Sequence, residues 1–413
     1  MAGLRVLISG AGIAGPVAGF FLSRAGAHVT VVERAPTLRA AGQQIDVRGA
    51  AAEIIKRMGL EETVRAKTTE EQGLQFVGSS GEVIGEFPVG EGKGFSSTTE
   101  IIRGDLAQIL YDAAKGAGVE FEFGDYVDGV EEIEGDGNGS KGVRISFGNS
   151  KQPREFDIFI IADGLGSRTR NLVFGSAADN AVRSLGQYAA YFTVPYHGPD
   201  GTWSRWYNAT GGRLILLRPD NNGTTRVWLS VMSSDTATMR ALVRSRSVDE
   251  QKAFLRTAFT NAGFEANRVL KGMDAAQDFY MDEIGQVKMG SWSQGRTVLV
   301  GDAGYCPSPI SGMGASVAIT GAYVLAGEIA RNPGPGDYKA AFEGYEGILR
   351  PFINDAQKLP PGAPAMANPQ TAWGLWAFNK MIGIASWSGI VGFMRKFSGG
   401  ITADNIKLPD YEI

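Results

Sequence analysis

Three glycines near the N-terminus have the spacing of a phosphate-binding turn. Gly10, Gly12 and Gly15 follow the apolar run of residues 4–9, and residues 16–24 have helical spacing. In such a turn the first glycine allows the sharp bend, the second lets backbone N–H groups approach a pyrophosphate, and the third lets the helix pack closely against the strand. The helix N-terminus then attracts an anion. The segment therefore predicts a dinucleotide site.

Glu33 stands at the end of the next apolar run, residues 29–32. A carboxylate at this point accepts hydrogen bonds from both ribose hydroxyls and repels a 2′-phosphate on the same sugar. The arrangement argues against NADP at this particular site. Ala14 and Arg34, which adjoin these motifs, are also predicted to bind the dinucleotide. The turn and the acid together still leave both FAD and NAD open.

Two later acidic residues favour FAD. Asp163 follows the apolar strand predicted at residues 156–162, and Asp302 follows the one predicted at residues 297–300. The carboxyl ends of parallel strands form the usual ligand edge of such sheets. A carboxylate there can accept a hydrogen bond from a ribityl hydroxyl, a group that NAD lacks. Taken alone, the GDAG segment at residues 301–304 is equally compatible with an ordinary turn, and the SGMG segment at residues 311–314 with a loop before a helix.

A second helix start is expected at the same site. Gly312 and Gly314 precede residues 316–331, which have helical spacing. The positive end of that helix would stabilise the negative charge of a reduced flavin by about 1 kcal/mol. Gly312, Gly314 and the adjoining Ala315 are therefore predicted to line the flavin site.

Composition narrows the classes of protein that fit. A chain of 413 residues exceeds the size at which one core stops growing, so two or more intertwined domains are expected. Hydrophobic residues make up 43% and charged residues 20%, as in ordinary globular proteins. A net charge of −4 without a basic stripe argues against a nucleic-acid partner. With Cys306 as the one cysteine and only two histidines, we expect no internal disulfide, no metal centre and a cytoplasmic location.

The pattern of apolar and polar residues changes twice along the chain. Residues 185–281 contain aromatic, alternating strands, and the α/β pattern then returns at residues 297–300. We predict an α/β fold in which a Rossmann-like FAD-binding domain is interrupted by a mostly antiparallel substrate domain and followed by a C-terminal helix. The expected limits are 1–72, 99–180 and 285–350 for the FAD-binding domain, 73–98 and 181–284 for the substrate domain, and 351–413 for the C-terminal segment.

The apolar stretch of residues 373–394 has two interpretations. A bilayer span would place Lys380 in hydrocarbon, at a cost of roughly 3 kcal/mol. A helix docked across both domains is therefore the favoured prediction, and the membrane alternative stays open.

Four motifs occur in an order that is typical of one enzyme family. They are GAGIAG with Glu33, RGDL at residues 103–106, DGLGSRTR at residues 163–170, and GDAGYCPSPISGMG at residues 301–314. With them the chain resembles the single-component, class A flavoprotein monooxygenases of the para-hydroxybenzoate hydroxylase fold, over essentially its whole length. Residues 45–60 and 216–228 look most like the tetracycline-inactivating monooxygenases and related natural-product hydroxylases.

That resemblance implies a chemistry. Non-covalent FAD, reduced by transiently bound NADPH, would react with O2 to give a C4a-hydroperoxide that hydroxylates a planar, electron-rich small molecule. Because the cofactor carries the difficult step, no acid or base side chain is required. A monomer or weak homodimer is expected. Two alternatives remain: a flavin-dependent reductase of a prenyl or lipid substrate, and a non-catalytic FAD-bearing binding module.

The resemblance also implies roles for single residues. Arg103 would reach the ribose and pyrophosphate of FAD, Asp163 would join the segment that orders NADPH and flavin, Asp302 would hold the ribityl chain, and Pro309 would lie beside the isoalloxazine ring. The chain departs from the family pattern at three positions, which carry Tyr305 in place of histidine, Ser316 in place of asparagine and Gly321 in place of aspartate.

The remaining candidates come from segments expected beside the flavin and over the pocket. Arg48 is the best candidate for a catalytic charge that steers flavin or nicotinamide, although an exposed arginine at a helix start fits equally well. Asp46 is predicted to contact the cofactor. The candidates for substrate contact, each better explained by sheet packing or solvent exposure, are Trp206, Tyr207, Arg213 and Trp228.

Overall fold

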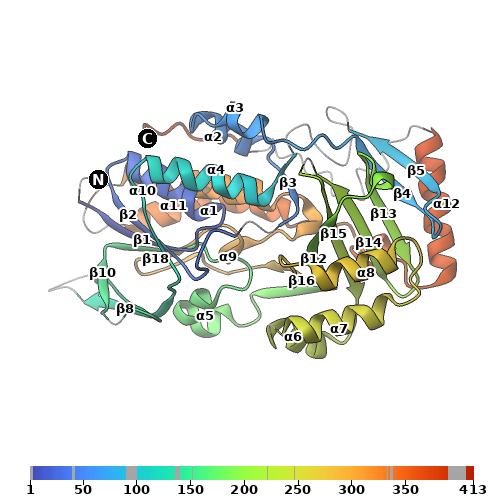
Figure 1. The fold of residues 1–413 in the computed structure, drawn as a ribbon. Coiled ribbons are helices and arrows are strands. Elements are labelled where there is room, and N and C mark those ends of the chain that lie inside the picture. The colour runs from blue at the N-terminus through green and yellow to red at the C-terminus, as the bar shows by residue number, and fades with distance from the viewer. Residues whose placement is uncertain are drawn as a thin grey trace.

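Two large sheets organise the computed structural model (Figure 1). The structure describes residues 3–39, 42–89, 100–134, 140–150, 152–220, 222–245, 247–332, 334, 338–388 and 406–413. One large sheet has six strands and the other has seven, and smaller sheets of three and two strands accompany them.

The six-stranded sheet is almost entirely parallel. Its strands, in spatial order, are β17 (Ser293–Gln294), β18 (Thr297–Leu299), β11 (Ile158–Ile161), β1 (Arg5–Ser9), β2 (His28–Glu33) and β7 (Glu120–Phe123), and only β17 is antiparallel. The inner strands are continuous apolar runs because both faces of the sheet are covered. Val6, Ile8 and Ile160 are fully buried, and each such side chain contributes about 1.5–3 kcal/mol relative to exposure.

Helices cover one face of this sheet, and the three-stranded sheet lies against the other (Figure 1). The helices pack as α1 against α4 and α10, and α10 against α2 and α11. Their bounds are α1 (Ala14–Arg24), α2 (Ala50–Arg57), α3 (Glu61–Arg65), α4 (Arg103–Gly116), α10 (Gly314–Arg331) and α11 (Tyr338–Ala356). The three-stranded sheet contains β8 (Val127–Glu134), β9 (Ser140–Phe147) and β10 (Arg154–Phe156), with α5 (Arg168–Phe174) beside it.

The seven-stranded sheet is antiparallel except where β13 pairs with β4. Its spatial order is β16 (Tyr280–Val287), β12 (Val182–Pro195), β15 (Thr224–Met232), β14 (Arg213–Pro219), β13 (Ser204–Ala209), β4 (Gly73–Val77) and β5 (Val83–Pro88). Three helices cover one face, namely α6 (Thr236–Ser245), α7 (Val248–Phe259) and α8 (Ala266–Ala275).

A short ribbon connects the two large sheets. It consists of β3 (Gln44–Asp46) paired antiparallel with β6 (Glu100–Ile102). The Gln44 side-chain amide donates to the carbonyl of Pro219, the last residue of β14, at 3.2 Å. The ribbon therefore ties the dinucleotide side of the molecule to the antiparallel sheet.

The predicted α/β class, with a Rossmann-like unit, a mostly antiparallel sheet and a C-terminal helix, is confirmed. The domain limits stay a prediction: β4 and β5 pair into the seven-stranded sheet, whereas residues 90–98 of the expected 73–98 segment lie outside the described residues.

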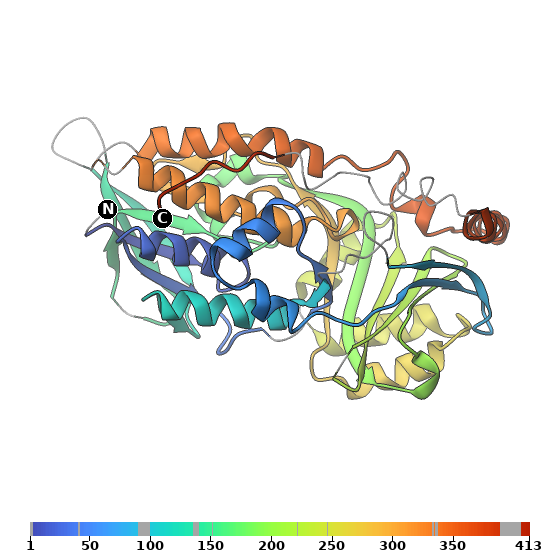
Figure 2. The same ribbon diagram turned by 90° about the horizontal axis from the view of Figure 1, so that it is seen from above.

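The C-terminal helix differs from its expected position. Helix α12 (Ala372–Ser388) packs on β5, at the outer edge of the seven-stranded sheet and far from the six-stranded sheet (Figure 2), rather than across both domains. Ile382 and Ala385 are its buried contacts with that sheet. Residues 389–394 of the predicted stretch lie outside the described part of the chain. None of the helices in the described residues is long and apolar enough to cross a membrane.

Candidate cofactor and substrate cleft

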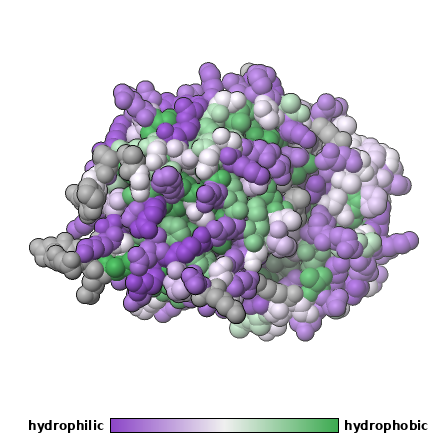
Figure 3. Space-filling model, turned by 60° about the vertical axis from the view of Figure 1, so that its left-hand side comes forward, coloured by the Kyte–Doolittle hydropathy of each residue, from purple (hydrophilic) through white to green (hydrophobic). Residues whose placement is uncertain are grey.

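A cavity of about 1940 Å³ lies between the two large sheets. Ordinary ligand pockets measure roughly 300–1,000 Å³, so this cavity has room for an extended dinucleotide and a second molecule. The ends of β1, β2 and β11 line one part of it, and the antiparallel sheet lines another. On the face shown in Figure 3, apolar residues gather near the centre and polar residues surround them.

The glycine turn is shaped by two close backbone approaches. Gly10 has φ +110°, and a Cβ atom there would lie 2.6 Å from the carbonyl oxygen of Ala162. A Cβ atom on Gly15 would lie 2.0 Å from the carbonyl oxygen of Gly10. Around Gly12, in contrast, the neighbour nearest to a Cβ would be the Arg103 guanidinium at 3.5 Å. The turn thus leaves a space between backbone N–H groups and a cation, which suits a pyrophosphate.

Glu33 lies at the tip of β2 and lines the cleft together with Ala14 and Arg34. Its two carboxylate oxygens accept hydrogen bonds from the backbone N–H groups of Ala11 and Ala35, each at 2.9 Å. These bonds hold the carboxylate beside the glycine turn, where a ribose acceptor was predicted.

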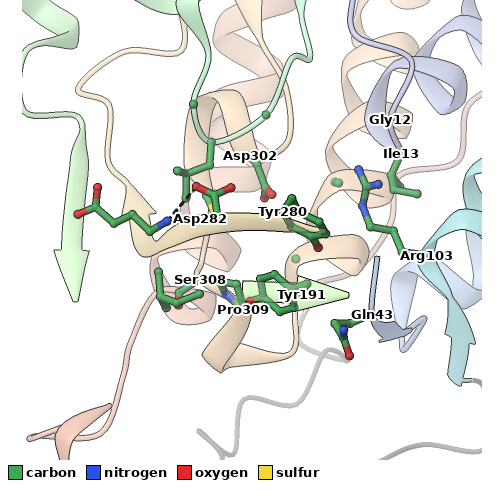
Figure 4. A pocket seen from close by; sticks show the side chains of 18 of the residues that line it. Gly12, Ile13, Gln43, Arg103, Tyr191, Tyr280, Asp282, Asp302, Ser308 and Pro309 are labelled. Carbon is green, nitrogen blue, oxygen red and sulfur yellow. Dashed lines mark hydrogen bonds between the residues drawn. The ribbon is translucent and has the colours of Figure 1, made fainter. Parts of the chain in front are cut away.

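Arg103 is the first residue of α4 and is directed into the cleft (Figure 4). Burial lowers the pKa of its guanidinium, and the neighbouring Tyr280, Asp302 and Glu33 oppose that effect. A buried cation gains most from a charged partner, and a pyrophosphate in the space beside Gly12 would provide one.

Asp163 and Asp302 each carry a buried oxygen that has no partner among the described residues. Asp163 follows β11 and accepts a hydrogen bond from the Thr169 hydroxyl at 2.9 Å. Asp302 begins the short helix α9 (Asp302–Tyr305) after β18. Burial raises the pKa of both carboxyl groups. Because an unpaired buried acceptor costs about 1–3 kcal/mol, both positions fit the hydroxyl-rich chain of FAD.

The segment after α9 also lines the cleft, including the predicted residues Pro309, Gly312, Gly314 and Ala315. Ser316, near the start of α10, accepts a hydrogen bond from the backbone N–H of Arg48 at 3.2 Å. The Arg48 side chain in turn forms an ion pair with Asp46, and both residues line the cavity. The start of α10 is thus tied to the segment that carries Arg48.

Two of the three departures from the family pattern compensate each other. The buried Tyr305 side chain points away from the cleft, and its hydroxyl lies 2.8 Å from that of Tyr345. A Cβ atom on Gly321 would lie 1.9 Å from the Tyr305 hydroxyl. The larger residue at 305 therefore requires the glycine at 321, and neither change alters the lining of the cleft.

Only two of the four predicted substrate contacts face the cavity. Trp206 on β13 and Trp228 on β15 line it. Tyr207 and Arg213 do not, contrary to the prediction. The Tyr207 hydroxyl donates to the carbonyl of Ala262, and Arg213 donates to that of Ala258 at 2.8 Å, both on the helix-covered face. Because successive residues of a strand point to opposite faces, Trp206 and its neighbour Tyr207 cannot both line the cavity.

Several cavity residues were missed by the sequence reasoning. Tyr191 and Tyr280 stack with ring centroids 4.9 Å apart, and the Arg39 guanidinium lies 4.0 Å from the Tyr280 centroid. Figure 4 shows Tyr191, Tyr280 and Asp302 around the same space as Arg103. Gln187, four residues before Tyr191 on β12, also lines the cavity. Gln187 and Tyr191 could have been found from the sequence, because alternate residues of a strand point to the same face.

Comparisons with known proteins agree with this geometry. The family model described as "FAD binding domain" matches residues 3–334. Monooxygenase CTB7 from Cercospora beticola is 40% identical over 425 residues, covering 99% of this chain and 97% of that protein. The crystal structure of tetracycline destructase Tet(51) has a TM-score of 0.80 at 31% identity, with 100% of both chains covered.

A more distant structure supports the fold alone. A variant of HpxO from Klebsiella pneumoniae, complexed with FAD, has a TM-score of 0.72 at 20% identity and covers 96% of this chain and 98% of that one. The glycine turn, the buried acids at two strand ends and these matches lead to one conclusion. The chain belongs to the FAD binding domain family and is a class A, FAD-dependent monooxygenase of the para-hydroxybenzoate hydroxylase fold.

Proposed function

We propose that the protein uses NADPH and O2 to insert one oxygen atom into a planar, electron-rich small molecule. The net reaction consumes substrate, O2, NADPH and a proton, and yields hydroxylated substrate, water and NADP⁺. We call the glycine turn, Glu33 and Arg103 the dinucleotide cradle. The observation that carries the proposal is the continuity of the cavity, which joins this cradle to the aromatic face of the antiparallel sheet.

The residues of the cradle suit the successive parts of FAD. The Gly12 backbone and Arg103 would hold the pyrophosphate, Glu33 the adenosine ribose, and Asp302 the ribityl chain. When bound, FAD supplies the transfer of electrons from a nicotinamide to O2. Arg48, whose charge is held by Asp46, is the cation proposed to orient the flavin or the nicotinamide.

The chain also provides a dry reaction chamber. Trp206, Trp228 and Leu216 line the sheet side, and Phe378 and Met381 of α12 line the cavity from the outer edge. Excluding water strengthens electrostatic interactions and limits the breakdown of reactive intermediates by water. This is the contribution expected from the antiparallel sheet and the C-terminal helix.

NADPH is the proposed reductant, bound transiently. Glu33 disfavours a 2′-phosphate in the dinucleotide cradle. Asp163 and the loop that follows β11 line the cavity beside that cradle, so NADPH is proposed to approach the flavin over this loop. The likeness to tetracycline destructase Tet(51) supports a planar, polycyclic substrate of the polyketide or tetracycline kind.

Oxygen uptake tests the proposal. The purified protein, loaded with FAD, is mixed with NADPH in air, and phenols, polyketides and tetracyclines are added one at a time. We expect at least one compound to accelerate both NADPH oxidation and O2 uptake and to gain one oxygen atom by mass spectrometry. A product that gains two hydrogen atoms without O2 uptake indicates a reductase. NADPH oxidation unaffected by every compound indicates a non-catalytic FAD-bearing protein.

A further inference from the structure

Three charged side chains form a buried cluster on the wall of the cavity. Arg218 on β14 donates to Glu71 at 2.9 Å and also to the Glu100 carboxylate. The Ser204 hydroxyl donates to Glu71 at 2.6 Å. The side chains of Glu71, Glu100 and Arg218 are 4%, 5% and 14% exposed, and all of them line the cavity. We call these three residues the Glu100 cluster.

The Glu100 cluster lies where the two halves of the cleft meet. Glu100 begins β6, which pairs with β3, and it stands opposite Asp46 in that pairing. Arg218 and Ser204 come from β14 and β13 of the antiparallel sheet. The ribbon that carries Glu100 therefore also carries Asp46, the partner of Arg48, so the cluster is adjacent to the segment expected beside the flavin.

One oxygen of Glu100 has no hydrogen-bond partner among the described residues, although it is buried. The indole N–H of Trp228 also has no partner among the described residues, and Trp228 lies opposite Leu216, two positions before Arg218 on β14. Because unpaired buried polar atoms are costly, this wall is complementary to a ligand that brings a hydroxyl donor and an acceptor.

The charges of the cluster do not balance. Two carboxylates share one guanidinium, which leaves one surplus negative charge in a place that water barely reaches. Burial raises the pKa of Glu100 to about 7, the negative charges of Glu71 and Asp46 act in the same direction, and Arg218 opposes them. Glu100 can therefore take up and release a proton near neutral pH.

We propose that Glu100 accepts the proton of an ionisable hydroxyl group of the substrate, with Arg218 and Glu71 positioning its carboxylate. This assignment rests on the proposed monooxygenase function and names the substrate class: an aromatic molecule bearing an acidic phenol or enol. The substrate O–H bond breaks, a new O–H bond forms on Glu100, and the electron pair stays on the substrate oxygen.

The transfer has a chemical purpose. The electron pair left on oxygen delocalises into the ring and raises the electron density at the carbon that is to be hydroxylated. Neither oxidant nor reductant is needed for this step, and the total charge of the site is unchanged. A simple phenol, with a pKa near 10, would transfer its proton uphill by roughly three pKa units. A phenol or enol conjugated with a carbonyl group is more acidic and matches Glu100 better.

A dye-binding experiment separates this role from a purely structural ion pair. Alizarin, a planar dihydroxyanthraquinone, changes colour when its acidic hydroxyl ionises, and the ionised band lies beyond the absorption of oxidised flavin. The FAD-loaded protein is titrated with alizarin, and with the ether in which that hydroxyl is methylated, across the pH range around 7. Wild type is compared with Glu100→Gln and with a matched control, Glu86→Gln, which replaces an exposed glutamate on β5.

Ionisation of the bound dye should depend on Glu100. Wild type and the Glu86→Gln variant should bind alizarin with the ionised band, whereas Glu100→Gln should bind it about tenfold more weakly and without that band at neutral pH. Ionised alizarin of equal intensity in Glu100→Gln, equal affinity for alizarin and its methyl ether, or no binding of alizarin would overturn it.

The wild-type protein alone provides a second test. Affinity for alizarin should pass through a maximum with pH, falling on the acid side as Glu100 becomes protonated and on the alkaline side as the free dye ionises. The methyl ether should show no such maximum, and a flat profile for alizarin contradicts the proposal. Neither titration uses NADPH or O2. A failure here therefore leaves the FAD content and O2 uptake of the proposed function intact, and can be distinguished from their failure.

Discussion

The two walls of the cleft are constructed in different ways. On the dinucleotide side the shape comes from the backbone, because Gly10 and Gly15 allow contacts that no side chain could share. On the substrate side it comes from side chains such as Trp206, Trp228 and Tyr191 on a regular sheet. The first wall can hold one kind of ligand, whereas the second can change its ligand by exchanging side chains without a change of fold.

The largest effect on stability is expected when a methyl group is added to Gly10, on the dinucleotide side of the cleft. Gly10→Ala combines a φ of +110° with a contact of 2.6 Å to the Ala162 carbonyl oxygen. We expect the free energy of unfolding to fall by about 3 kcal/mol or more, with loss of bound FAD. Denaturant unfolding and the flavin absorbance measure both effects.

The matched control for this substitution is Gly116→Ala. Gly116 ends α4, and no heavy atom lies within 4 Å of a Cβ placed there. Removing a glycine from a helix should stabilise the protein by roughly 0.5–1 kcal/mol. Equal stabilities of the two variants would show that the turn at Gly10 can relax, and the contrast between the walls would be lost.

Substitutions at Tyr305 and Gly321 should have coupled effects on the free energy of unfolding. Gly321→Ala places a methyl group 1.9 Å from the Tyr305 hydroxyl and should cost about 2 kcal/mol of unfolding free energy. In a Tyr305→Phe background the same change should cost less, because the hydroxyl is gone. The two single variants and the double variant form a cycle that is measured by denaturant unfolding. Simple additivity would mean that the residues at 305 and 321 do not compensate each other.

Asp302→Asn should act in opposite directions on the free and the FAD-bound protein. Burial raises the pKa of Asp302 in the folded state, so its charged form destabilises the apoprotein at neutral pH. The contribution of this carboxyl group is most favourable below the pKa of the unfolded chain and is lost as pH rises through the folded pKa. The apoprotein variant should therefore be more stable than wild type at pH 7, with the difference disappearing in acid.

FAD binding by the same variant should weaken by about tenfold, since a charged acceptor of a hydroxyl is removed. Thermal unfolding of the apoprotein against pH and titration with FAD measure the two effects separately. A variant that loses stability at pH 7 while retaining wild-type FAD affinity would show that Asp302 has a structural partner instead of a cofactor.

The cradle could be predicted because its parts are close in sequence. Gly10, Gly15 and Glu33 lie within one strand–helix–strand unit, and the spacing itself carries the information. The substrate wall offers no such signal. On β14, Leu214 and Leu216 pack toward α12 while Ile215 and Leu217 pack toward the helices of the other face, so both faces are apolar. The pattern therefore cannot tell which face borders the cavity.

Long-range charge pairs were equally inaccessible to sequence reasoning. Glu100 and Arg218 are 118 positions apart, and the contact between the β3–β6 ribbon and the end of β14 brings them together. The same tertiary effect placed α12 on the β4–β5 side of the antiparallel sheet, because its apolar residues indicate burial without specifying a partner.

The smallest effects should come from two adjacent residues of β13, which face opposite ways. Trp206→Phe changes the cavity wall and should alter KM by a few-fold, with the free energy of unfolding changed by less than about 1 kcal/mol. Tyr207→Phe removes the hydroxyl that donates to Ala262 and should cost about 1 kcal/mol of stability while leaving KM unchanged. Steady-state kinetics and denaturant unfolding of both variants compare the two faces directly. If Tyr207→Phe changed KM as much as Trp206→Phe, the division between a substrate-facing and a helix-facing side of this sheet would not hold.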